Sequence, residues 1–90
     1  MDERHYQLRE DLAWREFEDR LLVVDSGNGQ FHSLTEVGGF IWRQLHEGNN
    51  THSGIVSALL VEFEVEADLA RSDADAFLQR LVDVGLVRVE

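Results

Sequence analysis

Histidines are the side chains in this chain whose type and spacing are best suited to metal binding or acid–base chemistry. His46, Glu47 and His52 lie close together and could form a site of two histidines and one carboxylate. Their spacing does not match the HExxH helix motif, and a histidine near a helix end commonly interacts with the last carbonyl groups. We therefore expect no metal site and no cofactor.

The hydroxyl, thiol and carboxylate side chains show no catalytic pattern either. The chain has no cysteine, and none of its serines lies in a G-x-S-x-G elbow. Gly27 and Gly29 lie between two predicted strands, whereas a phosphate-binding loop would precede a helix. Asp73 and Asp75 form a close carboxylate pair, for which a solvated helix face is the simpler interpretation. We expect a protein without enzymatic activity.

Length and charge narrow the class of partner. The 90 residues suit one small domain, and they carry 18 acidic and 8 basic side chains, a formal net charge of −10. Nucleic acids and anionic membranes bind clusters of Lys and Arg, which this chain lacks. No segment matches a membrane span or a signal peptide. The composition favours a cytoplasmic protein that binds a peptide or another protein.

The first half of the chain predicts strands. Residues 1–11 are polar and are expected to be flexible, so that the domain comprises residues 12–90. Apolar residues alternate or cluster in three segments with strand periodicity: residues 12–17, 20–24 and 30–34. The middle segment is apolar on both faces, which is typical of a central strand covered on both sides. Residues 25–29 are rich in Gly and Asn and predict a hairpin turn.

The second half predicts helices. Apolar stripes with helical spacing mark three segments: residues 35–47, 51–63 and 67–84. Thr35 and Thr51 are expected to cap the first two helices. Gly38 and Gly39 each weaken the first helix by about 1 kcal/mol, a cost that close packing against the sheet would offset. The expected fold class is α+β, a three-stranded antiparallel β-meander packed on a trihelical winged-helix-like bundle.

This helix arrangement leaves one alternative function open, a winged-helix DNA-binding regulator. Helices 51–63 and 67–84 would form the helix-turn-helix, and residues 86–89 could form a wing or a terminal strand. The helix expected in the major groove carries acidic side chains at four positions, which would repel DNA: Asp68, Asp73, Asp75 and Asp83. A DNA-binding function is therefore the second choice.

The strand 30–34 has the sequence of an open sheet edge. Exposed strand edges are usually blocked by charge or proline, and QFHSL contains neither when histidine is neutral. An extended peptide could pair with this edge as a fourth strand, beside an apolar wall formed by Phe77, Leu78 and Leu81. The same edge could also pair with a second copy of the chain in a homodimer.

The pattern of apolar positions and glycines resembles the PqqD-like proteins, which recognise the leader segments of ribosomally made and modified precursor peptides. The resemblance covers nearly the whole chain beyond residue 11 and rests on these residues: Leu22, Val23, Val24, Asp25, Phe31, His32, Ser33, Leu34, Gly38, Phe40, Ile41, Trp42, Leu45, Gly48, Ile55, Leu59, Phe63, Val65, Asp73, Phe77, Leu78, Leu81, Gly85, Leu86 and Val87. It implies three strands packed on a winged-helix-like bundle.

The resemblance also implies a binding mode. The leader would dock antiparallel to the third strand and against the third helix. Carried over to this sequence, the peptide contacts would be Gln30, Phe31, His32, Ser33, Leu34, Asp73, Phe77, Arg80 and Leu81. The chain would act as a non-catalytic chaperone that presents the peptide to a modifying enzyme, such as a radical enzyme, a protease or a cyclase. Its acidic surface would favour a basic leader.

Two classes of pathway stay open. The Pro-Glu-Gly turn and the Leu-Asn pair associated with the quinone-cofactor proteins are replaced here by residues 26–29 and by Leu34 with Thr35. Stand-alone chaperones of lasso-type and other modified peptides are at least as similar. The resemblance therefore implies a precursor-peptide partner without naming the modification.

Overall fold

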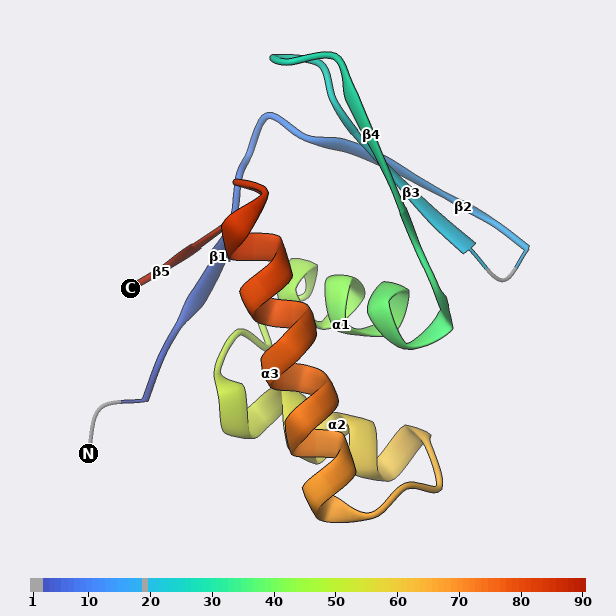
Figure 1. The fold of residues 1–90 in the computed structure, drawn as a ribbon, viewed down its shortest axis with the longest axis vertical. Helices are drawn as coiled ribbons and strands as arrows, with labels where there is room; N and C mark the ends of the chain where they lie inside the picture. Colours follow the sequence, from blue (N-terminus) through green and yellow to red (C-terminus); the bar gives the residue numbers. More distant parts are fainter. Residues whose placement is uncertain (1–2, 19) are drawn as a thin grey trace.

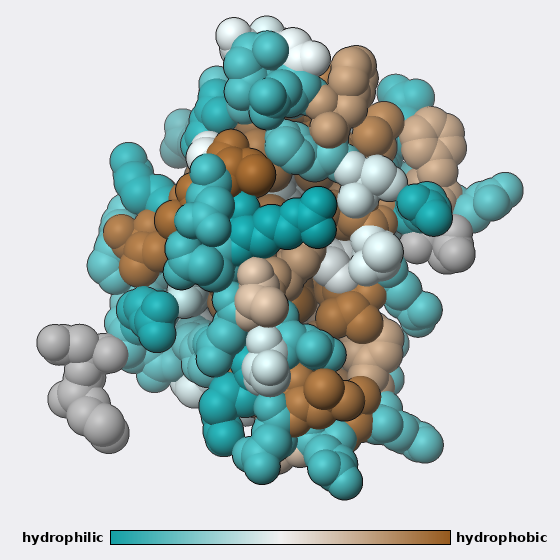
Figure 2. Space-filling model, viewed as in Figure 1, coloured by the Kyte–Doolittle hydropathy of each residue, from teal (hydrophilic) through white to brown (hydrophobic). Residues whose placement is uncertain are grey.

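A three-stranded sheet lies above the helices, and a separate pair of short strands lies to their left (Figure 1). The computed structural model describes residues 3–18 and 20–90, which form five strands and three helices. In chain order these are β1 (Tyr6–Leu8), β2 (Ala13–Phe17), β3 (Arg20–Asp25), β4 (Gln30–Leu34), α1 (Glu36–His46), α2 (His52–Glu62), α3 (Ala67–Asp83) and β5 (Val87–Val89). The predicted α+β class and the meander-plus-helices architecture are confirmed, and hydrophilic side chains cover much of the face in Figure 2.

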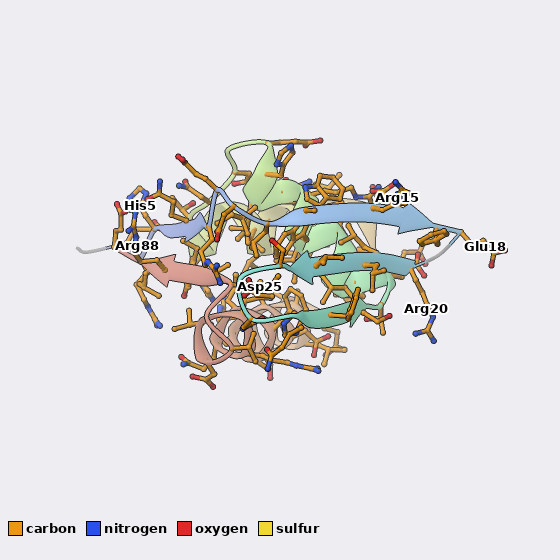
Figure 3. The ribbon with its side chains drawn as sticks, turned by 90° about the horizontal axis from the view of Figure 1, so that it is seen from above. His5, Arg15, Glu18, Arg20, Asp25 and Arg88 are labelled. Carbon is orange, nitrogen blue, oxygen red and sulfur yellow. The ribbon has the colours of Figure 1, made fainter. Side chains whose placement is uncertain are left out.

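Strands β2, β3 and β4 form an antiparallel sheet in that spatial order. Val23 of β3 pairs with Trp14 on one side and with His32 on the other, so these three side chains share the face that points towards the helices. Val23 is fully buried, whereas Leu22 and Val24 on the opposite face are only half-buried. The prediction that β3 is covered on both sides is therefore wrong, because no helix of the described residues lies over the outer face (Figure 3).

The helices begin and end within one or two residues of their predicted bounds. Thr51 caps α2 as predicted, because its hydroxyl oxygen accepts a hydrogen bond of 3.1 Å from the N–H of Gly54. Thr35 occupies the N-cap position of α1, as predicted, but its side chain makes no capping hydrogen bond. Apolar stripes of all the helices meet in one core, in which Ile41, Ile55 and Leu78 are fully buried.

Two glycines of α1 permit close packing. A Cβ atom on Gly39 would lie 3.4 Å from Leu21 Cβ of β3, which confirms the predicted contact with the sheet. A Cβ atom on Gly38 would lie only 2.7 Å from the ring of Phe77 on α3. The glycines that weaken α1 locally thus bring it against both the sheet and the last helix.

The N-terminal segment contains a strand that the sequence did not predict. Residues Tyr6–Leu8 form β1, which pairs antiparallel with β5, and the Tyr6 side chain is only 3% exposed. The N–H of Tyr6 also donates to the carbonyl of Asn50 at 2.8 Å. The sequence also predicts a turn at Glu18 and Asp19, of which Asp19 lies outside the described residues. The C-terminal strand pairs with β1, so the outer edge of β4 has no partner strand among the described residues.

Candidate peptide-binding site

The outer edge of β4 is available for backbone pairing. Its inner edge pairs with β3 from Leu21↔Leu34 to Asp25↔Gln30, and no strand of the described residues pairs with its other side. Alternate backbone N–H and C=O groups of an edge strand point away from the sheet. The sequence prediction of an open edge at residues 30–34 thus matches the arrangement of the strands.

A hollow of about 120 Å³ lies between this strand and α3. Among the predicted contact residues, those lining it are Phe31, His32, Ser33, Leu34, Phe77, Arg80 and Leu81. Val84 and Leu86 complete the lining and were not predicted as contacts. Val84 directly follows α3 and continues the helical spacing of Phe77 and Leu81, whereas Leu86 reaches the hollow only through the turn at Gly85.

Two predicted contacts lie outside this hollow. Gln30 is exposed at the hairpin end of β4, where its N–H donates to Asn28 Oδ1 at 3.0 Å. Asp73 is exposed on α3, one helical turn before Phe77. Both could contact a longer peptide beyond the hollow, but neither helps to form its wall.

Apolar and cationic groups share the wall of the hollow. Phe77 and Leu81 project from α3, and Leu34 from β4 is buried beside them. Arg80 has no carboxylate partner among the described residues, and Nε2 of His32 is buried without a hydrogen-bond partner there. No acidic side chain lines the hollow, although the chain as a whole is strongly acidic. The arrangement suits an apolar side chain with a hydrogen-bond acceptor nearby.

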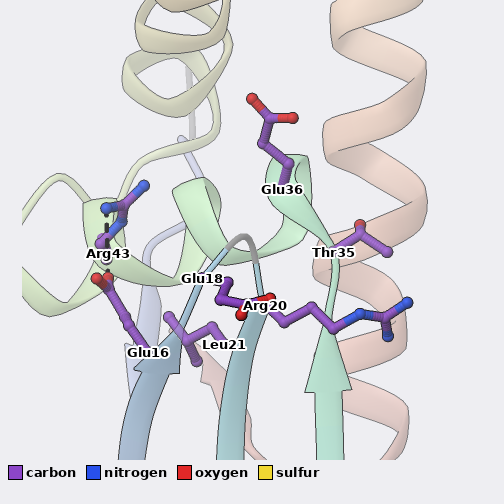
Figure 4. A pocket seen from close by; sticks show the side chains of 7 residues that line it. All are labelled: Glu16, Glu18, Arg20, Leu21, Thr35, Glu36 and Arg43. Carbon is purple, nitrogen blue, oxygen red and sulfur yellow. Dashed lines mark ion pairs between the residues drawn. The ribbon is translucent and has the colours of Figure 1, made fainter.

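A second hollow, of about 290 Å³, lies near the turn between β2 and β3 (Figure 4). Its lining mixes charges of both signs: Glu16, Glu18, Arg20, Leu21, Thr35, Glu36 and Arg43. Arg43 and Glu16 form an ion pair of 3.3 Å across it. This hollow has little apolar lining and does not adjoin an apolar helix wall, so it is a weaker candidate for peptide binding.

The histidines that suggested a metal site contact different partners. The ring of His46 packs edge-on against Trp14, with 5.1 Å between ring centroids. Nε2 of His52 lies 2.5 Å from Asp75 Oδ1 of α3. Within residues 3–18 and 20–90, no group of three or more His, Asp or Glu side chains could hold a metal ion. In the same part of the chain, no helix is long and apolar enough to cross a membrane.

Comparison with known proteins identifies the family. The sequence pattern of the family described as coenzyme PQQ synthesis protein D (PqqD) matches residues 20–87. The chain belongs to the PqqD family. The matched region contains β4, α3 and every residue that lines the hollow between them. No curated protein sequence matches the chain significantly.

Two solved structures share the fold. One is described as TbiB1 in complex with the TbiA(beta) leader peptide; it has 24% sequence identity and a TM-score of 0.84, and the match covers 91% of this chain and 94% of that one. The other is described as lasso peptide synthetase B1 complexed with the leader peptide, with 21% identity, a TM-score of 0.81 and coverage of 93% and 98%. At these identities the likeness shows the fold.

Proposed function

We propose that this PqqD-family protein is a non-catalytic peptide chaperone that binds the leader segment of a precursor peptide and presents it to a modifying enzyme. The observation that carries the proposal is the unpaired edge of β4 beside a hollow with apolar walls. Main-chain hydrogen bonds to the edge would supply affinity, and the hollow would select a side chain.

The two solved structures support this proposal, because both are described as complexes with a leader peptide. Their fold covers almost the whole of this chain, including β4 and α3. The peptide would become a quinone cofactor, a lasso peptide or another modified product.

The proposed pose follows from strand geometry. A leader antiparallel to β4 would place alternate side chains towards the helices, where one of them would occupy the hollow. The contacts would come from Gln30, Phe31, His32, Ser33 and Leu34 of β4 and from Asp73, Phe77, Arg80 and Leu81 of α3. Because one short strand is ordered, we expect micromolar to submicromolar affinity, about −8 to −10 kcal/mol.

The remaining expectations belong to the same proposal. The receiving enzyme would be a radical enzyme, a protease or a cyclase, and both proteins would work in the cytoplasm. A homodimer formed through β4 would compete with the leader, because both need the same edge. The DNA-binding alternative gains no support from the structure, since Asp68, Asp73, Asp75 and Asp83 are all exposed on α3.

The experiment is a titration with the leader segment of the precursor peptide encoded beside this chain's gene. Phe31→Pro and His32→Pro each remove one backbone N–H. Neighbouring N–H groups in a strand point to opposite sides, so one variant loses a donor to the peptide and the other a donor to β3. We expect the variant that loses a donor to the peptide to lose peptide binding while it keeps its fold. Unchanged affinity in both variants would refute strand addition.

A further inference from the structure

The outer face of the three-stranded sheet is a surface without a partner in the described residues. Register places the side chains of Ala13, Val24 and Phe31 in one row across it, and those of Arg15, Leu22 and Ser33 in the next. Phe17 and Arg20 form the last pair. In Figure 3 the sheet lies in front of the helices, with Arg15 and Arg20 towards one end.

This face is unusually apolar for a surface. Phe31 is 68% exposed and Phe17 is 54% exposed, while Leu22 and Val24 between them are half-buried. Antiparallel sheets commonly have one solvated face that alternates with polar residues. Here five of the eight positions are apolar, which is typical of a surface that contacts another protein.

Charge gives the surface its second distinctive property. Its charged side chains are Arg15 and Arg20, although the whole chain carries a formal charge of −10. Arg20 donates a hydrogen bond of 3.4 Å to Ser33 Oγ, and neither arginine forms an ion pair within the described residues. An apolar surface whose two guanidinium groups have no carboxylate partner in the described part of the chain is complementary to an apolar surface that carries carboxylates.

We propose that this outer face docks the enzyme that receives the peptide, through a surface of apolar side chains and carboxylates on that enzyme. The inference rests on the proposed function. A leader strand added to β4 would extend the same sheet, and its alternate side chains would lie on the outer face beside Phe31. The enzyme would then contact the chaperone and the leader together, and would bind the loaded chaperone more tightly than the free one.

A second copy of the chain is a poorer occupant. Two outer faces packed against each other would bring Arg15 and Arg20 of one copy against those of the other, without carboxylates to neutralise them. Such a dimer would be weakest at low salt, because salt screens the repulsion between like charges. The face therefore fits an acidic partner better than itself.

The test uses the purified modifying enzyme encoded beside this chain's gene. Arg15→Glu and Phe17→Ser change β2, the strand at the far edge from β4, so leader affinity should stay the same. We expect each to weaken enzyme binding about tenfold, the effect of losing one charged or apolar anchor at an interface. Arg71→Glu is the matched control, since Arg71 is exposed on α3 and pairs with Asp68 at 3.3 Å.

The outcomes separate the two proposals. Enzyme binding that is equal in wild type, Arg15→Glu and Phe17→Ser, with leader binding intact, would overturn this inference alone. Tighter enzyme binding by Arg15→Glu would also overturn it, because the enzyme's docking surface would then be basic. If the wild-type chain bound no leader, the proposed function would fail and this inference with it. Self-association that Phe17→Ser abolishes and Arg15→Glu strengthens would assign the face to a second copy.

Discussion

The guanidinium of Arg9 lies 2.6 Å from the buried carboxylate of Asp25, and this contact joins segments that are far apart in the chain. Asp25 is 1% exposed and also accepts a hydrogen bond of 3.1 Å from the N–H of Gly27. The backbone N–H of Arg9 donates to the carbonyl of Leu86 at 3.2 Å. The β1–β5 pair, the β3–β4 hairpin and the end of α3 therefore meet at one ion pair, near Asp25 in Figure 3.

Removing this cation should destabilise the fold. Arg9→Gln leaves the Asp25 carboxylate buried without its counter-charge, so we expect a clearly lower midpoint of urea unfolding. The control is Arg71→Gln, which breaks the exposed pair with Asp68 and should cost less than about 1 kcal/mol. Equal midpoints for the two variants would show that the Arg9 contact does not stabilise the protein.

Gly38 should control the shape of the hollow. A methyl group at this position would lie 2.7 Å from the Phe77 ring, which would have to move towards the bound peptide. We expect Gly38→Ala to reduce leader affinity, because the displaced ring changes the wall of the hollow, and to cost about 1–3 kcal/mol of folding stability, the usual effect of overpacking. Gly39→Ala has the same effect on helix propensity but meets only Leu21 at 3.4 Å, and calorimetry should show unchanged leader affinity. A similar affinity loss in both variants would show that a weakened α1, and not a changed hollow, reduces peptide binding.

The two threonines before α1 and α2 offer a matched comparison of capping. Thr51→Ala removes an acceptor for the Gly54 N–H and should lower the free energy of unfolding by about 1 kcal/mol. Thr35→Ala removes no such bond, and its effect should be near zero. Thermal or urea unfolding measures both, and a larger loss for Thr35→Ala would contradict the assigned caps.

Asp11 should make stability depend on pH at the acidic end. Hydrogen bonds from Arg9 hold the pKa of Asp11 below its ordinary value of 3.8. Because the folded-state pKa is lowered, the stabilisation is fully present above the ordinary value and is lost as pH falls through the lowered one. Asp11→Asn should therefore lower the unfolding midpoint at neutral pH, and its difference from wild type should shrink as pH falls through the lowered pKa.

Glu3 should make stability depend on pH in the same direction as Asp11, because hydrogen bonding to Ser53 lowers the pKa of Glu3. Glu3→Gln should behave like Asp11→Asn. Glu64→Gln is the control, because Glu64 is exposed and has no ion pair within the described residues. A difference from wild type that persists unchanged at low pH would show that these carboxylates do not act through their charge.

Local patterns were sufficient to predict β2 to α3, because alternation and helical spacing depend on residues close together in the chain. Strand β1 could not be predicted in this way. Its three residues lie in a polar segment and form a strand only by pairing with β5 at the other end of the chain, such as Tyr6 with Val89. The Arg9–Asp25 ion pair was missed for the same reason.

Much of the hollow could also be predicted, since strand 30–34 and the apolar stripe of helix 67–84 both had to face the core. Two residues show the limit of that argument. Asp73 shares a helix with Phe77 but lies outside the hollow, and Leu86 enters it from a turn. The residues of the outer face could be predicted only from the strand register. The sequence alone does not tell towards which face of the sheet an apolar side chain of β3 points.

Amide hydrogen exchange of β4, with and without the leader peptide, tests the central claim most directly. Strand addition predicts that alternate amides of residues 30–34 exchange quickly in the free protein and become protected when the peptide binds. The intervening amides, which donate to β3, should be protected in both states. A peptide that binds with full affinity while every β4 amide keeps its free-state exchange rate would contradict the account.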